Sequence, residues 1–189
     1  MVIQSDIMLR GDSWNLAVNE LAPIFKTRTR YSIYLLSTAI GIAYDKQIVE
    51  LEKTETVSAD ASNYPSVPRT VFNQNNVPFD YLFKTAILSS DCVNLIEKER
   101  LRLAFEDEDN KEDLYFTGGE EAGNNEFNKI LFLTGFANFG VTKLIENIGN
   151  TNLETMENLK EYLNSIVEGN NVEISDMLEL KDDDFESLL

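Results

Sequence analysis

Three basic side chains, Lys26, Arg28 and Arg30, form the densest cationic cluster in the 189-residue sequence. They alternate with threonines directly before a segment of helical periodicity. The hydroxyl groups and the first N–H groups of that helix would join the bases in holding a phosphate. The alternative interpretation is that these bases form ion pairs with the protein's own acidic segments. We favour the ion pair, because three bases are few for nucleic-acid binding and the net charge is −17.

The remaining reactive residue types are sparse. The sequence has no histidine, which excludes Ser-His-Asp triads, Cys–His dyads and His-ligated metal sites. Its one cysteine, Cys92, is interpreted as an inert packing residue. The acidic run at residues 106–113 lacks the mid-loop glycine and the alternating ligands of a calcium loop. We therefore predict no catalytic residue, no metal site and no cofactor, and a protein that is not an enzyme.

Asn138 lies between Phe136 and Phe139 in the most strongly apolar segment, residues 126–148. We interpret it as a residue that satisfies buried backbone groups. Gly135 and Gly140 interrupt the same helical pattern, where each costs about 1 kcal/mol relative to alanine. They predict either the close approach of a crossing helix or a kink near Asn138.

Capping signals and apolar periodicity outline the elements of the first half. A helix is predicted over residues 14–21 and ends at Pro23, and a second, buried on most sides, covers residues 30–44. Residues 54–76 are predicted to be a connector with one short extended piece at 69–72. A further helix begins at residues 76–80 and stops near residues 89–90, and Asp91 is expected to cap the next one.

The second half is dominated by residues 126–148, which are predicted to form the central helix. The uncharged run between Lys129 and Lys143 has 13 residues, fewer than the roughly 20 that span a bilayer. A buried core helix is therefore favoured over a membrane helix. Residues 151–154 match a capping box for a following helix, which the glycine and asparagines of residues 169–171 end.

These elements predict an all-α fold: one compact domain, residues 1–169, with six or seven helices around a central buried helix. The absence of a leader-like pattern at residues 1–11, together with the single cysteine, predicts a cytoplasmic protein without a membrane segment.

Acidic side chains are concentrated in two segments. Residues 106–126 carry 1 basic and 9 acidic side chains, and residues 146–189 carry 2 and 12. We predict an acidic surface loop at 106–125 and an acidic amphipathic segment at 170–189. Apolar residues of that last segment would dock on a basic-rimmed groove of a partner protein or on the protein's own domain; the candidates are Met177, Leu178, Phe185, Leu188 and Leu189.

Two stretches, residues 26–46 and 132–144, resemble the small accessory proteins of bacterial Dnd phosphorothioation defence islands. Residues 39–41 (Ala-Ile-Gly) and 137–140 (Ala-Asn-Phe-Gly) match the order and relative position of that family's two short motifs. Residues 133–135 depart from its acidic pair. The resemblance covers about residues 25–148 and implies a bacterial cytoplasmic protein that acts in phage defence beside larger DNA-acting enzymes. It carries over no catalytic residue.

Three hypotheses for function follow. The first is a non-enzymatic adaptor subunit of an anti-phage defence or DNA-processing complex. The second is an acidic DNA mimic that blocks a DNA-binding enzyme, which requires carboxylates held at the spacing of phosphates. The third is weak nucleic-acid binding through Lys26, Arg28 and Arg30, with Arg69 as a further candidate.

Overall fold

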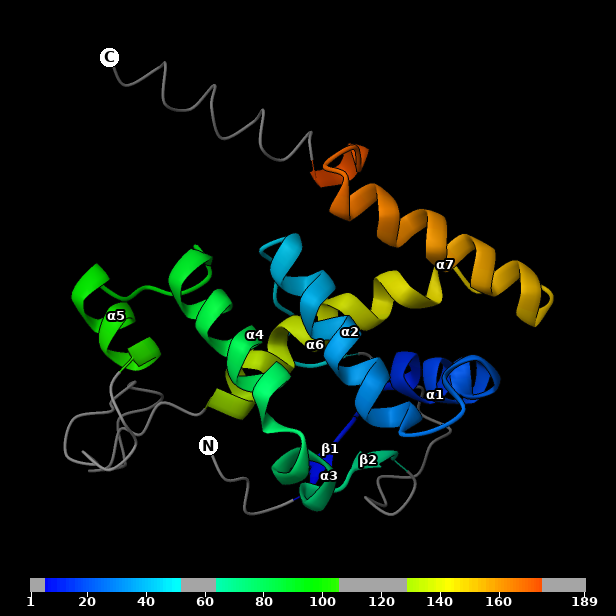
Figure 1. The fold of residues 1–189 in the computed structure, drawn as a ribbon, viewed down its shortest axis with the longest axis horizontal. Helices are drawn as coiled ribbons and strands as arrows, with labels where there is room; N and C mark the ends of the chain where they lie inside the picture. The colour runs from blue at the N-terminus through cyan, green and yellow to red at the C-terminus, as the bar shows by residue number, and fades with distance from the viewer. Residues whose placement is uncertain (1–5, 52–63, 106–128, 175–189) are drawn as a thin grey trace.

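The computed structural model describes residues 6–51, 64–105 and 129–174, and these are folded into helices around one core. The all-α class is confirmed (Figure 1). The described part contains one small sheet and seven helices, in the order β1 (Ile7–Met8), α1 (Asp12–Phe25), α2 (Thr29–Ala43), β2 (Ser66–Val67), α3 (Arg69–Gln74), α4 (Asn76–Ser89), α5 (Glu97–Phe105), α6 (Lys129–Ile145) and α7 (Asn152–Val167). None of these helices is long and apolar enough to cross a membrane.

Helix α6 is the central helix, as predicted, and α1, α2 and α4 all pack against it (Figure 1). Five of its side chains are completely buried: Leu133, Phe136, Ala137, Val141 and Leu144. Residues 126–128 of the predicted helix lie outside the described residues. Burial on this scale favours the helix by roughly 1.5–3 kcal/mol for each large side chain.

Glycines let α2 and α6 cross in backbone contact. A Cβ atom on Gly41 would overlap the backbone of Phe136, and one on Gly140 would overlap the backbone of Ser37. Because 41 faces 136 and 37 faces 140, the two helices run antiparallel at this crossing. The prediction that Gly140 admits a crossing helix is thus correct, and the partner glycine lies in α2.

An aromatic cluster surrounds Tyr34 on the next part of α2. The ring of Tyr34 meets Trp14 of α1, Phe72 of α3 and Phe79 of α4, with centroids 6.2, 5.4 and 6.4 Å away. These contacts join four helices, and they explain why α2 is apolar on most of its sides.

The predicted end of the first helix is wrong. Helix α1 runs to Phe25 and contains Pro23 in its last turn. A proline there removes only its own N–H bond to the preceding turn. The residues after it still bond normally, as the 3.0 Å bond from the N–H of Lys26 to the carbonyl of Ala22 shows.

The predicted connector at residues 54–76 is ordered in its described part, residues 64–76. The expected extended piece at 69–72 is wrong, because helix α3 begins at Arg69, directly after Pro68. Tertiary packing explains the helix: Phe72 is buried between Tyr31, Tyr34 and Phe79. The short sheet beside it, with Ile7 opposite Val67, also had no sequence signal.

Helix α5 starts later than predicted, at Glu97, and Asp91 does not cap it. The guanidinium of Arg100 donates to three carbonyls of the preceding stretch, those of Ser90, Val93 and Leu95, at 2.6–3.0 Å. These bonds satisfy three backbone carbonyls that lie before α5 and therefore have no helical N–H partner. The predicted start of α4 at Asn76 and its stop at Ser89 are correct.

The capping prediction for α7 is correct. Thr151 accepts the N–H of Glu154 at 3.2 Å, and the carboxylate of Glu154 reaches back to the N–H of Asn150 at 2.8 Å. The helix ends at Val167, followed by Gly169 with φ of +70°, a backbone conformation that favours glycine.

The close crossing gives a first prediction. Gly140→Ala should lower the free energy of unfolding by about 2 kcal/mol or more, because the methyl group meets rigid backbone at Ser37. Urea unfolding measures this change. Gly135→Ala is the matched control: its Cβ meets only the Gln47 side chain, at 3.3 Å, and the helix gains about 1 kcal/mol of propensity. Equal losses in the two variants would contradict the backbone contact.

Candidate functional site

The basic cluster occupies the loop between α1 and α2. Lys26 and Arg28 adopt left-handed backbone conformations, with φ of 52° and 55°, and all three basic side chains are exposed. Arg28 donates to the Asn75 side chain at 2.6 Å, and Arg30 donates to the carbonyl of Ser66 at 3.3 Å. These bonds hold the two guanidinium groups against α3 and β2.

Arg28 and Arg30 line an open depression of about 270 Å³, which we call the basic depression; its other walls are Thr29, Tyr31, Val67, Pro68 and Val71. Lys26 is not among its lining residues. The start of α2 lies in the same wall, so two cations and a helix N-terminus face one hollow. Tyr31 donates its hydroxyl to the carbonyl of Asn75, and burial raises the pKa of that hydroxyl.

Charge is distributed unevenly between the described part and the rest. Residues 6–51, 64–105 and 129–174 carry 13 basic and 15 acidic side chains, so 3 of the 16 bases and 18 of the 33 acids lie elsewhere in the sequence. The acidic loop and most of the acidic C-terminal segment fall outside the described residues. Both the ion-pair interpretation of the basic cluster and the DNA-mimic hypothesis depend on them and stay predictions.

The five predicted docking residues, Met177, Leu178, Phe185, Leu188 and Leu189, also lie outside the described residues. The chain that leads to them is held firmly. Asn171 accepts from the hydroxyl of Tyr44 at 3.3 Å and donates to Ser165 at 2.9 Å, and Glu173 pairs with Lys143 at 3.0 Å. The hydrogen bond from Lys143 lowers the pKa of Glu173.

Asn138 uses its whole amide in the core, which confirms its predicted role. It donates to the carbonyls of Ile48 and Val49, at 3.0 and 3.3 Å, and accepts the indole N–H of Trp14 at 2.9 Å. The link to Trp14, 124 residues away, had no signal in the sequence. Both the nitrogen and the oxygen of the amide therefore have partners in the fold.

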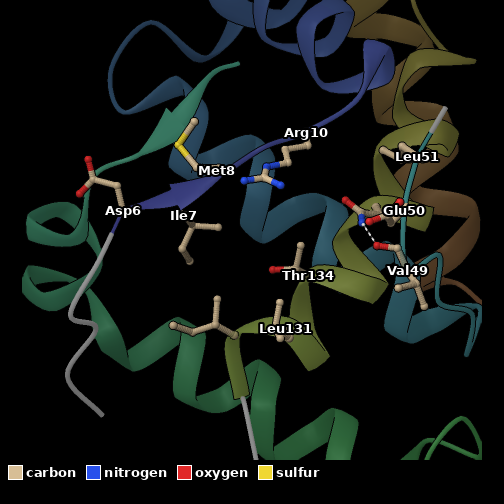
Figure 2. A pocket seen from close by; sticks show the side chains of 11 residues that line it. Asp6, Ile7, Met8, Arg10, Val49, Glu50, Leu51, Leu131 and Thr134 are labelled. Atoms are coloured by element: carbon tan, nitrogen blue, oxygen red, sulfur yellow. Dashed lines mark hydrogen bonds between the residues drawn. The ribbon is translucent and has the colours of Figure 1, made fainter. Parts of the chain in front are cut away.

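The segment after α2 lies along α6 and forms a wall of a second cavity. Gln47 donates to the carbonyl of Phe132 at 3.1 Å, and the N–H of Ile48 donates to the carbonyl of Gly135 at 3.0 Å. Gly135 leaves room for this segment. The cavity, about 410 Å³, lies between the segment, α6 and β1 (Figure 2). Sequence reasoning missed it, because its walls come from three distant parts of the chain.

Cys92 is exposed, so its predicted role as a packing residue is wrong. The thiol of Cys92 donates to the carbonyl of Asp45 at 3.1 Å, and burial, followed by the nearby Asp45 carboxylate, raises its pKa. A group of three or more metal-ligating side chains is absent among residues 6–51, 64–105 and 129–174.

Comparisons with known proteins give no match to a protein-family model, to a curated protein or to a solved structure.

The Asn138 network gives a second prediction. Asn138→Ala should lower the free energy of unfolding by about 2–4 kcal/mol, because the buried indole N–H and two carbonyls lose their partner. Asn158→Ala, which removes one 3.4 Å bond to the carbonyl of Asn147, is the control and should cost less than about 1 kcal/mol.

A double-mutant cycle with Trp14→Phe isolates the indole bond. We expect a coupling of about 1 kcal/mol between the two substitutions. Strict additivity would show that the bond does not contribute to stability.

Proposed function

We propose that this protein is a non-enzymatic interaction subunit whose partner-binding face is formed by α4 and α5. One observation carries the proposal: of thirteen large apolar residues exposed in the described part, six lie within residues 76–105. They are Val77, Tyr81, Leu88, Ile96, Leu101 and Phe105, on or beside two helices that pack against each other. Large apolar side chains left exposed on neighbouring helices are of the kind that a partner protein covers.

Helix α4 separates its two faces cleanly. Phe79, Phe83 and Ile87 are buried, whereas Val77 and Tyr81 are 73% and 74% exposed on the opposite side. These two residues are four apart, so they lie on one stripe of the helix. An ion pair between Asp80 and Lys84, 2.8 Å long, borders the stripe. Tyrosine at such a position supplies a large contact area at a low entropy cost and is enriched among binding hot spots.

The resemblance of residues 26–46 and 132–144 to Dnd-island accessory proteins supports one kind of partner. On this basis the partner is a larger DNA-acting enzyme of a bacterial defence complex. The α4–α5 face, defined by the six residues above, is the surface that this enzyme would cover.

Site-specific crosslinking tests the proposal. A photoreactive phenylalanine analogue replaces Tyr81 in the full chain, and the crosslinked products are identified by mass spectrometry in the native host. We expect one protein to dominate the products from position 81. The same analogue at Leu153, which is 60% exposed on α7, is the control and should give at least fivefold less of that product.

A second variant tests the chemistry of the contact. Val77→Lys, on the same stripe, should reduce the crosslink at position 81 at least tenfold while the melting temperature stays within about 2 °C, because Val77 is exposed. Equal crosslinking at positions 81 and 153, or an undiminished crosslink in Val77→Lys, would refute the α4–α5 face.

The basic depression favours a second candidate function, weak nucleic-acid binding. Its guanidinium groups and the start of α2 provide the donors that phosphate contacts use. The proposal predicts a gel shift of duplex or single-stranded nucleic acid at low salt, weakening steeply as salt rises.

Combined replacement of Lys26, Arg28 and Arg30 by alanine should abolish that shift. Because Arg28 and Arg30 also bond to Asn75 and Ser66, the melting temperature of the variant must be checked. Lys160→Ala on α7, which removes one exposed cation outside the cluster, is the charge control. A missing shift at low salt, or one retained by the triple variant, would exclude this function.

A further inference from the structure

We propose that the cavity between β1, α6 and residues 49–51 binds a small apolar molecule that carries a carboxylate. Its volume of about 410 Å³ lies in the range of about 300–1,000 Å³ typical of ligand pockets. Its walls combine apolar side chains with a few polar groups, as such sites do; the lining residues used below are Ile7, Met8, Arg10, Glu50, Leu131 and Thr134 (Figure 2).

Both long walls of the cavity are fixed before any ligand arrives. Asn138 and the backbone of α6 hold residues 47–49 through the hydrogen bonds described above. On the other side, β1 pairs with β2, the N–H of Leu9 donates to the carbonyl of Pro65 at 2.9 Å, and Asp6 accepts from the N–H of Arg69 at 2.9 Å. A preformed cavity loses less entropy on binding than one that must be assembled.

Arg10 is the cation that selects the ligand. Its side chain extends from the end of β1 over the cavity (Figure 2). Within the described residues it has neither a hydrogen bond nor an ion pair, whereas Asp6 has its carboxylate turned away from the cavity (Figure 2) and bonded to Arg69. A guanidinium beside apolar walls matches a carboxylate, which it can bind through two parallel hydrogen bonds.

Thr134 adds a second donor on the α6 wall. Its hydroxyl lies 3.0 Å from that of Tyr34, which is fully buried. Burial raises the pKa of Tyr34, so the phenol keeps its proton. Either hydroxyl can donate at this distance; we take Tyr34 as the donor, because its buried O–H has Thr134 as its one acceptor among the described side chains. The hydroxyl proton of Thr134 is then available to a ligand oxygen.

The remaining walls define the body of the ligand. Ile7, Met8 and Leu131 supply aliphatic groups to the lining; Ile7 and Met8 leave opposite sides of β1, with Ile7 on the side of Thr134 and Leu131 (Figure 2). A short aliphatic body suits a space of this size. Glu50 lines the opposite side and is exposed, so it disfavours a second negative charge on the ligand and tolerates an ammonium group. Simple fatty acids and apolar amino acids share the required chemistry.

Titration of the ¹⁵N-labelled full chain with hexanoate, 1-hexanol, hexylammonium and norleucine tests the proposal by NMR. We expect hexanoate to shift amide signals of residues 7–10, 48–51 and 130–138, and to bind at least tenfold more tightly than hexanol or hexylammonium. Norleucine distinguishes a zwitterionic ligand, which would use Glu50, from a simple acid.

Arg10→Gln is the decisive variant. It should weaken hexanoate binding at least tenfold and change hexanol binding less than twofold, with an unchanged spectrum outside the cavity. Arg30→Gln, in the basic depression, removes another exposed guanidinium outside the cavity lining and should leave hexanoate binding unchanged. Undetectable hexanoate binding at 10 mM, equal affinities of hexanoate and hexanol, or an equal loss in both arginine variants would each overturn the proposal.

Discussion

The backbone contact between α2 and α6 is the constraint on which the rest of the described structure depends. Gly41 and Gly140 bring two helices closer than side chains normally permit, and each faces a backbone group of the other helix, at Phe136 and Ser37. The contact requires a small residue at position 37 as well. The hydroxyl of Ser37 is buried without a hydrogen-bond partner in the described structure, a cost that the close packing of the two helices offsets. Helix propensity alone opposes glycine at both positions, so packing decides the outcome.

The crossing also determines where the chain goes after α2. The helix ends at Ala43, just past the contact between Gly41 and Phe136 of α6, and residues 47–49 return along α6 in contact with Gly135. The amide of Asn138 then joins this returning segment to Trp14 of α1. One helix pair and one amide therefore position two walls of the 410 Å³ cavity, α6 and the returning segment, whereas pairing with β2 holds the third wall, β1.

The sequence predicted those elements whose formation depends on neighbouring residues, such as helix caps and apolar repeats. The Thr151–Glu154 cap, the start of α4 at Asn76 and the long apolar pattern of α6 could all be read from neighbouring residues. The predictions were wrong where contacts with other parts of the chain determine the backbone conformation. Arg100 binds carbonyls that a helix would otherwise bond, so α5 begins later. The burial of Phe72 stabilises α3 where an extended piece was expected. The candidate sites follow the same division. The basic cluster was visible in the sequence, whereas the depression beside it needs β2, and the cavity needs contacts across more than 80 residues.

The α4–α5 face differs from the cavity, because the crossing of α2 and α6 does not position its residues. Its exposed side chains stand opposite the buried ones of the same helices, so they can change without disturbing the core. In the sequence, the carboxylate-rich residues 106–113 directly follow the exposed Phe105. Apolar contacts supply affinity, and charges around them supply specificity and speed of encounter. The surface that our proposal requires on a partner is therefore apolar where it would cover Val77 and Tyr81.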